Sequence, residues 1–140
     1  MRIFLDANIL FSAAKSEGAV RGFLVRLGSL GHTLVVDGYV AGEARRNIEV
    51  KFPEAVDDLE SLLAGCEILT ELCAPLAGGI APELTEKDRP VLAAAIQHRY
   101  DVLVTGDKTH FRPLYGQSIK GVMIHSPGSL AGHLGLNVRS

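Results

Sequence analysis

The sequence has no tryptophan, only two cysteines and 6% aromatic residues in 140 positions. Cys66 and Cys73 are seven positions apart, a spacing that matches no zinc pattern and is weak evidence for a disulfide framework. There is no basic segment leading into an apolar targeting stretch, and no apolar run long enough to cross a bilayer. We therefore expect a cytoplasmic protein with reduced cysteines and no membrane contact.

The sequence also lacks an excess of charge of either sign. Lysine and arginine number 14, aspartate and glutamate 16, and the formal net charge is −2. The chain is not a polycation, so bulk charge does not indicate a nucleic-acid partner, although a local basic rim could still bind one. With 47% hydrophobic and 21% charged residues the composition is ordinary for a globular protein, and we expect a single domain over residues 1–140.

Apolar segments alternate between continuous runs and helical spacing. The continuous runs predict strands at 2–6, 32–37, 66–70, 101–107 and 121–127. The helical spacing predicts two pieces within 7–30 and further helices at 39–51, 53–64, 85–99 and 128–135. Residues 71–84, with their prolines and paired glycines, are predicted to form a loop. This order is typical of a three-layer α/β/α sandwich with a mostly parallel central sheet of about five strands.

Acidic residues stand at the ends of three predicted strands: Asp6, Asp37 and Asp107. In open parallel sheets, ligands bind beyond the carboxyl ends of the strands. Each acid also has an ordinary structural explanation, because Asp6 and Asp37 could cap the helices that follow and Asp107 could be a turn residue. Taken singly, the structural explanation is the better one, and we interpret Asp37 as a helix cap.

Two further acids are predicted to lie in or at the start of helices. Glu43 lies within the 39–51 helix, where a solvated or salt-bridged side chain is as consistent with the pattern as a functional one. Asp88 enters the 85–99 helix just before Pro90. Thr85 and Asp88 resemble a capping box, although such boxes favour Glu or Gln at the later position.

Taken together, four of these acids favour a functional explanation over the separate structural ones. Asp6, Glu43, Asp88 and Asp107 would converge if the first and fourth strands were neighbours in the sheet. Crowded carboxylates raise one another's pKa unless a cation neutralises them, and Mg²⁺ or Mn²⁺ suits such oxygen-rich sites. These ions activate water and stabilise leaving oxygens. No Ser–His–Asp or Cys–His set is evident, so the pattern favours phosphodiester hydrolysis.

Four segments occur in an order and spacing that resemble the PIN domain family, and together they cover essentially the whole chain. They are "FLDANIL" at the start, Glu43, "KDRPVLAAAI" and "LVTGDKTHF". PIN domains are metal-dependent ribonucleases, and many are VapC-like toxins of toxin–antitoxin pairs. The resemblance implies a parallel sheet between helices, which agrees with the interpretation above.

Carried to this sequence, the resemblance implies that Asp6, Glu43, Asp88 and Asp107 surround the metal site. It also implies that Asn8 supports Asp6 and that Thr105 supports the loop that presents Asp107. Thr109 stands where many members carry a further acid, so one metal ion or two remain open.

Four basic or imidazole side chains lie beside the predicted site and are candidates for binding RNA phosphates: Arg89, Lys108, His110 and Arg112. A solvated basic rim explains them equally well. His110 as a general base is a weaker hypothesis, because the metal already supplies activated water.

The resemblance implies an Mg²⁺- or Mn²⁺-dependent endoribonuclease with an RNA substrate, an antitoxin partner and a homodimeric state. An apolar face around Val20, Phe23 and Leu24 could contribute to the dimer or belong to the core. The first alternative is a catalytically inactive PIN-like module that binds RNA or protein, against which the presence of all four acids argues. The second, a doubly wound phosphatase or phospho-acceptor domain, does not match the Asp88–Pro90 helix start.

Overall fold

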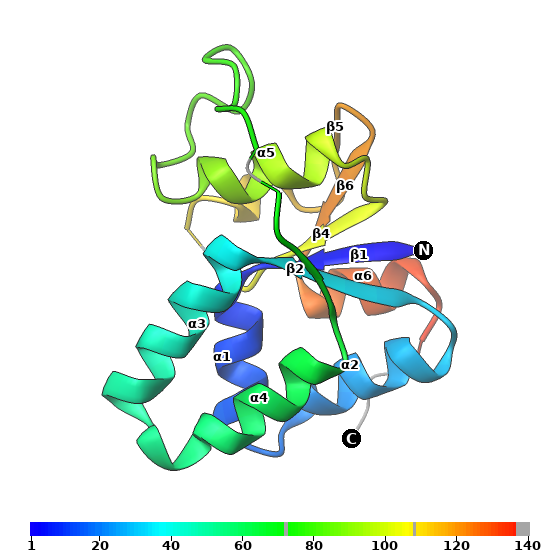
Figure 1. The fold of residues 1–140 in the computed structure, drawn as a ribbon. Coiled ribbons are helices and arrows are strands. Elements are labelled where there is room, and N and C mark those ends of the chain that lie inside the picture. The colour runs from blue at the N-terminus through cyan, green and yellow to red at the C-terminus, as the bar shows by residue number, and fades with distance from the viewer. Residues whose placement is uncertain (72, 108, 137–140) are drawn as a thin grey trace.

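The computed structural model describes residues 1–71, 73–107 and 109–136, and these form a mixed α/β fold around one six-stranded sheet (Figure 1). The strand order is β3-β2-β1-β4-β6-β5. The strands are β1 (Arg2–Leu5), β2 (Thr33–Asp37), β3 (Glu67–Leu69), β4 (Val102–Val104), β5 (Ser118–Ile119) and β6 (Val122–His125). All neighbouring pairs are parallel except β5 and β6. The predicted fold is confirmed, with one short antiparallel strand beyond the expected five.

Helices cover both faces of the sheet. They are α1 (Ala7–Lys15), α2 (Ala19–Ser29), α3 (Gly38–Lys51), α4 (Val56–Ala64), α5 (Arg89–Gln97) and α6 (Pro127–His133). Helix α5 lies on one face, whereas α1, α2, α4 and α6 lie on the other, and α3 packs against α1 and α4 (Figure 1). Among the described residues, no helix combines the length and apolar character needed to cross a membrane.

The central strands are apolar throughout because both of their faces are covered. Ile3, Phe4 and Leu5 of β1 are fully buried, and so is all of β4. Phe4 stacks on Tyr100 with a ring separation of 5.4 Å. This packing fixes the two strands whose carboxyl ends carry Asp6 and Thr105.

The apolar face of α2 belongs to the core. Phe23 and Leu24 are 4% and 3% exposed, and Val20 packs against the same cluster. These side chains therefore bury their apolar surface within the chain itself. Phe23 and Leu24 therefore offer no surface for a dimer contact. The expected homodimer itself stays a prediction.

The helix predicted over 85–99 is shorter in the structure. Residues 85–88 form a turn, in which the Asp88 N–H donates to the Thr85 carbonyl at 3.0 Å, and α5 begins at Arg89. Pro90, which lacks an N–H, lies in the first turn where no donor is needed. The helix ends before Arg99, which has a φ of 55°. The turn matters because it sets the position of Asp88.

Strand β5 is absent from the prediction because it has only two residues. Lys120 and Gly121, with φ of 50° and 87°, form the two-residue connection to β6. Positive φ at both central residues is the geometry of a type I′ hairpin. The prediction extended the last strand over 121–127, whereas Gly121 lies in the turn and α6 begins at Pro127.

The strand register brings the predicted site residues together. β1 and β4 are neighbours with Leu5 opposite Val104, and the Asp6 N–H extends the pairing by donating to the Val104 carbonyl at 2.9 Å. The condition for convergence of Asp6 and Asp107, adjacency of the first and fourth predicted strands, is thus met.

Candidate metal centre

Asp6 is a buried carboxylate between β1 and α1, only 4% exposed. One oxygen, Oδ1, accepts the Ala7 N–H at 2.7 Å, and Asp6 is the N-cap of α1. The other, Oδ2, accepts the Thr105 hydroxyl at 2.9 Å. Burial is the main cause that raises the pKa of Asp6 to about 6, and the nearby charges of Asp88 and Glu43 add to it. Asp6 can therefore cap α1 and belong to the candidate site at the same time.

Thr105 joins the ends of β1 and β4 through its buried hydroxyl. Besides donating to Asp6, this oxygen accepts from the Asn8 amide at 3.3 Å and from the Asp107 N–H at 3.2 Å. Asn8 in turn accepts the Gly106 N–H at 2.8 Å through Oδ1. Asn8 and Thr105 thus lie in the supporting positions that the resemblance implies, although their functional role stays a prediction.

Asp107 is held in the loop after β4 by backbone donors. Its Oδ1 accepts the Thr109 and His110 N–H groups at 2.7 and 2.9 Å. Its Oδ2 lies 3.2 Å from His110 Nδ1. Burial raises the pKa of Asp107, but the hydrogen bonds from His110 and Thr109 outweigh it, so the pKa lies below the usual value. Asp107 is therefore an ionised carboxylate at neutral pH.

Asp88, Asp107 and His110 form a compact group of potential metal ligands. One ligand atom from each lies within 4.8 Å of the others, and His110 Nδ1 is 3.5 Å from Asp88 Oδ2. The Thr85 hydroxyl donates to Asp88 Oδ2 at 2.9 Å and accepts the Asp88 N–H at 3.3 Å. The prediction placed His110 on the substrate side of the site, whereas the structure places its imidazole between two carboxylates.

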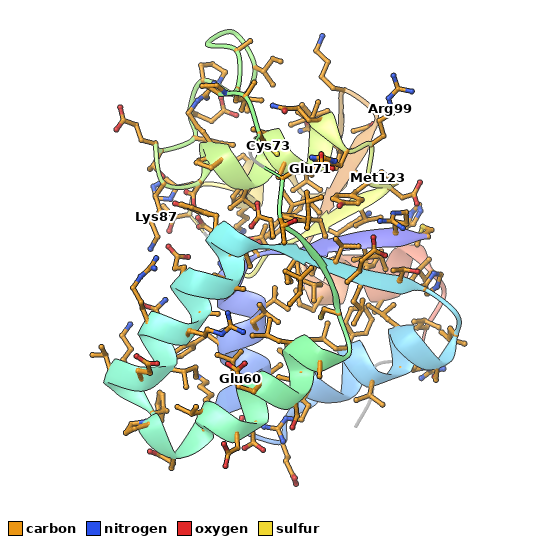
Figure 2. All side chains as sticks on the ribbon, viewed as in Figure 1. Glu60, Glu71, Cys73, Lys87, Arg99 and Met123 are labelled. Carbon is orange, nitrogen blue, oxygen red and sulfur yellow. The ribbon has the colours of Figure 1, made fainter. Side chains whose placement is uncertain are left out.

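Glu43 faces the same space from α3. The helix starts at Asp37, whose carboxylate accepts the Val40 N–H at 2.8 Å, as expected for its N-cap. Glu43 Oε1 lies 3.2 Å from the Lys87 ammonium, and Lys87 lies near the start of α3 in Figure 2. This pair links α3 to the 85–88 turn.

The four predicted acids line one cleft of about 560 Å³. Asn8 and His110 line it too. Six lining residues were not predicted: Phe11, Ser12, Asn47, Lys51, Thr85 and Lys87. Helical spacing could have identified three of them, because Ser12 lies four positions after Asn8, and Asn47 and Lys51 lie four and eight after Glu43. Lys87 carried a weaker signal, being next to Asp88.

Among the described residues, Arg89, Thr109 and Arg112 do not line this cleft. Arg89 donates to the Ala77 carbonyl at 2.7 Å and the Ala81 carbonyl at 2.9 Å, so its guanidinium holds the preceding loop. Arg89 lines a different pocket, which lies on the opposite side of the start of α5 from the acidic cleft. Arg112 is exposed and lines a third pocket. Thr109 contributes its backbone N–H to Asp107. Lys108 lies outside the residues that the structure describes.

The donor set fits a hard divalent cation. Its members are carboxylate oxygens with one imidazole. Burial is the main cause of the raised pKa of Asp6, and the charges of Asp88 and Glu43 raise it further. A cation of the Mg²⁺ or Mn²⁺ type relieves such repulsion and accepts oxygen ligands. The cleft can therefore hold a cation of this kind.

Comparison with known proteins gives similarity in fold alone. No family model matches the chain, and no curated protein matches it in sequence. A chain in the crystal structure of VapBC2 from Rickettsia felis, bound to a DNA fragment from their promoter, has a TM-score of 0.65 and 18% identity, over 90% of this chain and 98% of that one. A chain of VapBC-1 from nontypeable Haemophilus influenzae has a TM-score of 0.60 and 14% identity, over 91% and 99%. The architecture expected from the resemblance is therefore also that of chains in VapBC assemblies.

Proposed function

We propose that this protein is an Mg²⁺- or Mn²⁺-dependent endoribonuclease that hydrolyses RNA phosphodiester bonds. The observation that carries the proposal is the convergence of Asp6, Glu43, Asp88 and Asp107 in one cleft from four separate parts of the chain. Structural ion networks usually pair each acid with a base. Among the described residues, Lys87 contacts Glu43 and the His110 imidazole is shared by Asp88 and Asp107, whereas no basic side chain contacts the buried Asp6.

In this proposal Asp6, Glu43, Asp88 and Asp107 surround the cation, and the proximity of Asp88 and Asp107 supports it. When bound, Mg²⁺ or Mn²⁺ lowers the pKa of water and stabilises negative charge on phosphoryl oxygens. Thr105 fixes the orientation of Asp6, and Thr85 does the same for Asp88. Backbone donors keep Asp107 ionised, so it needs no deprotonation before it binds a cation.

Lysine side chains at the cleft supply contacts for the substrate. Lys87 and Lys51 both line it, and ammonium groups bind RNA phosphates as point charges. His110 lies between Asp88 and Asp107, where its Nδ1 can hold a proton shared with either carboxylate. The two ammonium groups offset part of the negative charge of the acids as the RNA backbone approaches.

The proposal includes a role as the toxin of a toxin–antitoxin pair, with a protein antitoxin as its partner. Support comes from the shared fold with chains of VapBC assemblies, which agrees with the resemblance in the four sequence segments. A non-catalytic module that binds RNA or protein is the alternative, and the complete acidic cleft argues against it.

The test is cleavage of a pool of structured RNAs with Mg²⁺, Mn²⁺ or EDTA by the wild-type protein and Asp6→Asn. The wild type is expected to cut with either metal and not with EDTA, and Asp6→Asn to lose the activity. Glu49→Gln is the matched control, because Glu49 is an exposed acid of α3 outside the cleft. Equal cutting by the wild type and Asp6→Asn, or no cutting with any metal, would contradict the proposal. RNA binding without cutting would favour the alternative.

A further inference from the structure

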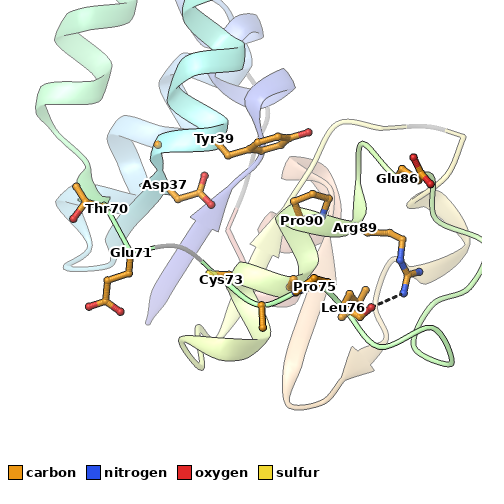
Figure 3. Close-up of a pocket in the computed structure, with 13 residues that line it drawn as sticks. Asp37, Tyr39, Thr70, Glu71, Cys73, Pro75, Leu76, Glu86, Arg89 and Pro90 are labelled. Atoms are coloured by element: carbon orange, nitrogen blue, oxygen red, sulfur yellow. Dashed lines mark hydrogen bonds between the residues drawn. The ribbon is translucent and has the colours of Figure 1, made fainter.

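A second pocket, of about 600 Å³, lies on the other side of the start of α5 (Figure 3). It is formed by the end of β2, the start of α3, the segment after β3 and the first turns of α5. Much of its wall is apolar, from residues such as Cys73, Pro75, Leu76, Pro90 and Ala93. Asp88, Arg89 and Pro90 are consecutive, and the first lines the acidic cleft while the other two line this pocket. The two cavities are therefore neighbours.

Asp37 places a hydrogen-bond acceptor in this apolar wall. Asp37 is 8% exposed, and its side chain points toward Tyr39 and Pro90 in Figure 3. Its Oδ1 accepts the Val40 N–H at 2.8 Å, and the backbone N–H groups of Asp37 and Tyr39 also favour the ionised carboxylate. Among the described bonds no protein side chain donates to it, so its second oxygen keeps acceptor capacity on the pocket side. A carboxylate in an apolar pocket favours a ligand edge that carries N–H donors. Burial raises the pKa of Asp37, which agrees with this setting.

Tyr39 contributes an exposed aromatic surface to the pocket and is hydrogen-bonded to a residue of the acidic cleft. It is 41% exposed, and its hydroxyl donates to the Lys87 carbonyl at 3.0 Å. Lys87 lines the acidic cleft, whereas Tyr39 lines the pocket. The hydrogen bond fixes the ring, so a planar ligand can stack on it at little entropic cost. Aromatic rings beside a backbone-binding groove are a recurrent means of holding unpaired bases.

Charge excludes a phosphate as the occupant. Glu71, Glu86 and Asp37 all line the pocket. The Arg89 guanidinium, which also lines it, already donates to the carbonyls of the preceding loop. An uncharged planar group with N–H donors suits these walls better than an anion does.

We propose that this pocket binds an unpaired guanine base of the RNA whose backbone lies in the acidic cleft. Guanine presents two adjacent donors, N1–H and the N2 amino group, to the Asp37 carboxylate, while its ring stacks on Tyr39. The other bases offer a single donor site on that edge. The proposal rests on the proposed ribonuclease function for its substrate class, and it adds a sequence preference to it.

Binding of free nucleosides tests the pocket without any cleavage. Guanosine, adenosine, cytidine and uridine are uncharged, so the acidic cleft does not repel them. Each is added at equal concentration to ¹⁵N-labelled protein in EDTA, and amide shifts are followed by NMR. Guanosine is expected to shift the amides of Gly38, Tyr39 and Ala93 and to bind at least about 10-fold more tightly than the others, the discrimination typical of a bidentate base contact.

Asp37→Asn isolates the acceptor, because Asn is an equally good helix N-cap but replaces one acceptor oxygen with a donor. The guanosine preference is expected to disappear in this variant. Tyr39→Leu is expected to weaken binding of all four nucleosides. Asp57→Asn, a change of the same kind at an exposed position in the first turn of α4, should leave the preference intact.

Equal responses to the four nucleosides, shifts confined to other parts of the chain, or a guanosine preference that survives in Asp37→Asn would each overturn the proposal. Mapping of RNA cleavage sites separates it from the proposed function. Guanosine binding without any RNA cleavage would contradict the ribonuclease and leave the pocket standing. Metal-dependent cleavage without a guanine preference at the cut sites would support the ribonuclease and contradict the guanine pocket.

Discussion

Asp6 and Asp37 occupy equivalent places on neighbouring strands yet lie in different surroundings. Each stands at the carboxyl end of a parallel strand, Asp6 just after β1 and Asp37 as the last residue of β2, and each caps the next helix and has a pKa raised by burial. Asp6 faces other carboxylates in a polar cleft, whereas Asp37 faces a largely apolar pocket. The strand–acid–helix pattern thus produces the cap in both cases. The chemistry open to each acid depends on what the rest of the chain brings beside it.

The largest difference is expected in metal binding and cleavage. Asn at position 6 or 37 retains a helix cap, so neither change should unfold the protein. Asp6→Asn is expected to reduce Mn²⁺ affinity and to lower the rate of RNA cleavage by about 100-fold or more, the range for a single positioned electrostatic group. Asp37→Asn should retain Mn²⁺ affinity. Titration calorimetry measures the Mn²⁺ affinity, and initial rates measure RNA cleavage. Equal losses of affinity and rate in Asp6→Asn and Asp37→Asn would remove the distinction between the two sites.

The second difference concerns pH in the presence of EDTA. The pKa of Asp6 rises from 3.8 to about 6 on folding, so the folded state binds the proton more tightly than the unfolded state. Its contribution therefore stabilises the fold at low pH and is lost as pH rises from about 4 to 6, a change of about 3 kcal/mol at ~1.4 kcal/mol per pH unit.

Urea unfolding between pH 4 and 7 measures this slope. Asp6→Asn should flatten it and leave two contributions of opposite sign: that of Asp37, whose pKa is raised like that of Asp6, and that of His125, whose pKa is lowered by burial. The lowered pKa of Asp107 acts below its ordinary value of 3.8 and so falls outside this window. Saturating Mn²⁺ at pH 7 should restore stability to the wild type. If the free energy of unfolding of Asp6→Asn changed with pH as steeply as that of the wild type, the burial of Asp6 would not be the cause of the pH dependence.

Thr105→Val tests the support that Asp6 has and Asp37 lacks. The change keeps the shape of the buried side chain but removes the hydroxyl that bonds Asp6, Asn8 and the Asp107 N–H. The free energy of unfolding is expected to fall by about 1–3 kcal/mol, because a buried charged acceptor loses a donor. Thr109→Val is the control, since the contact of Thr109 with Asp107 comes from its backbone. Similar denaturation midpoints for Thr105→Val and the wild type would refute the linking role.

The smallest effect is expected from the cap alone. Asp37→Ala removes the acceptor for the Val40 N–H and should cost about 1 kcal/mol in thermal unfolding. Asp37→Asn should stay within a few tenths of a kcal/mol of the wild type. Equal destabilisation by both substitutions would mean that the carboxylate charge, rather than the cap, stabilises α3.

The sequence predicted the sheet and most helices because strong apolar periodicity determines them. Strands β1, β2 and β4 lie in continuous, largely apolar runs of the sequence, so their type could be inferred without knowing their neighbours. β5 could not, because two residues carry no periodicity and its pairing depends on the Lys120–Gly121 turn. The 85–88 turn was not predicted because Thr85 and Asp88 also fit a helix start. In the structure the hydrogen bonds between these two residues stabilise the turn instead.

The candidate site was partly predictable for a similar reason. The acids could be found because they stand at strand ends and in family-like segments. The role of Thr105 as a junction, and the diversion of Arg89 to the loop carbonyls, depend on side-chain contacts between residues far apart in the chain. Such contacts leave no local pattern. Residue type alone suggested that Arg89 would meet phosphate, whereas geometry places it elsewhere.

The row of Glu43, Asn47 and Lys51 along α3 gives the acidic cleft a direction. The three residues follow one face of the helix at intervals of four, from an acid at one end to an ammonium group at the other, over roughly 12 Å at 1.5 Å per residue. A polymer lying along this row meets unlike ends, and so its two possible orientations are energetically inequivalent. For the RNA of the proposed function, the helix thereby sets the polarity of the bound strand before a single base is recognised.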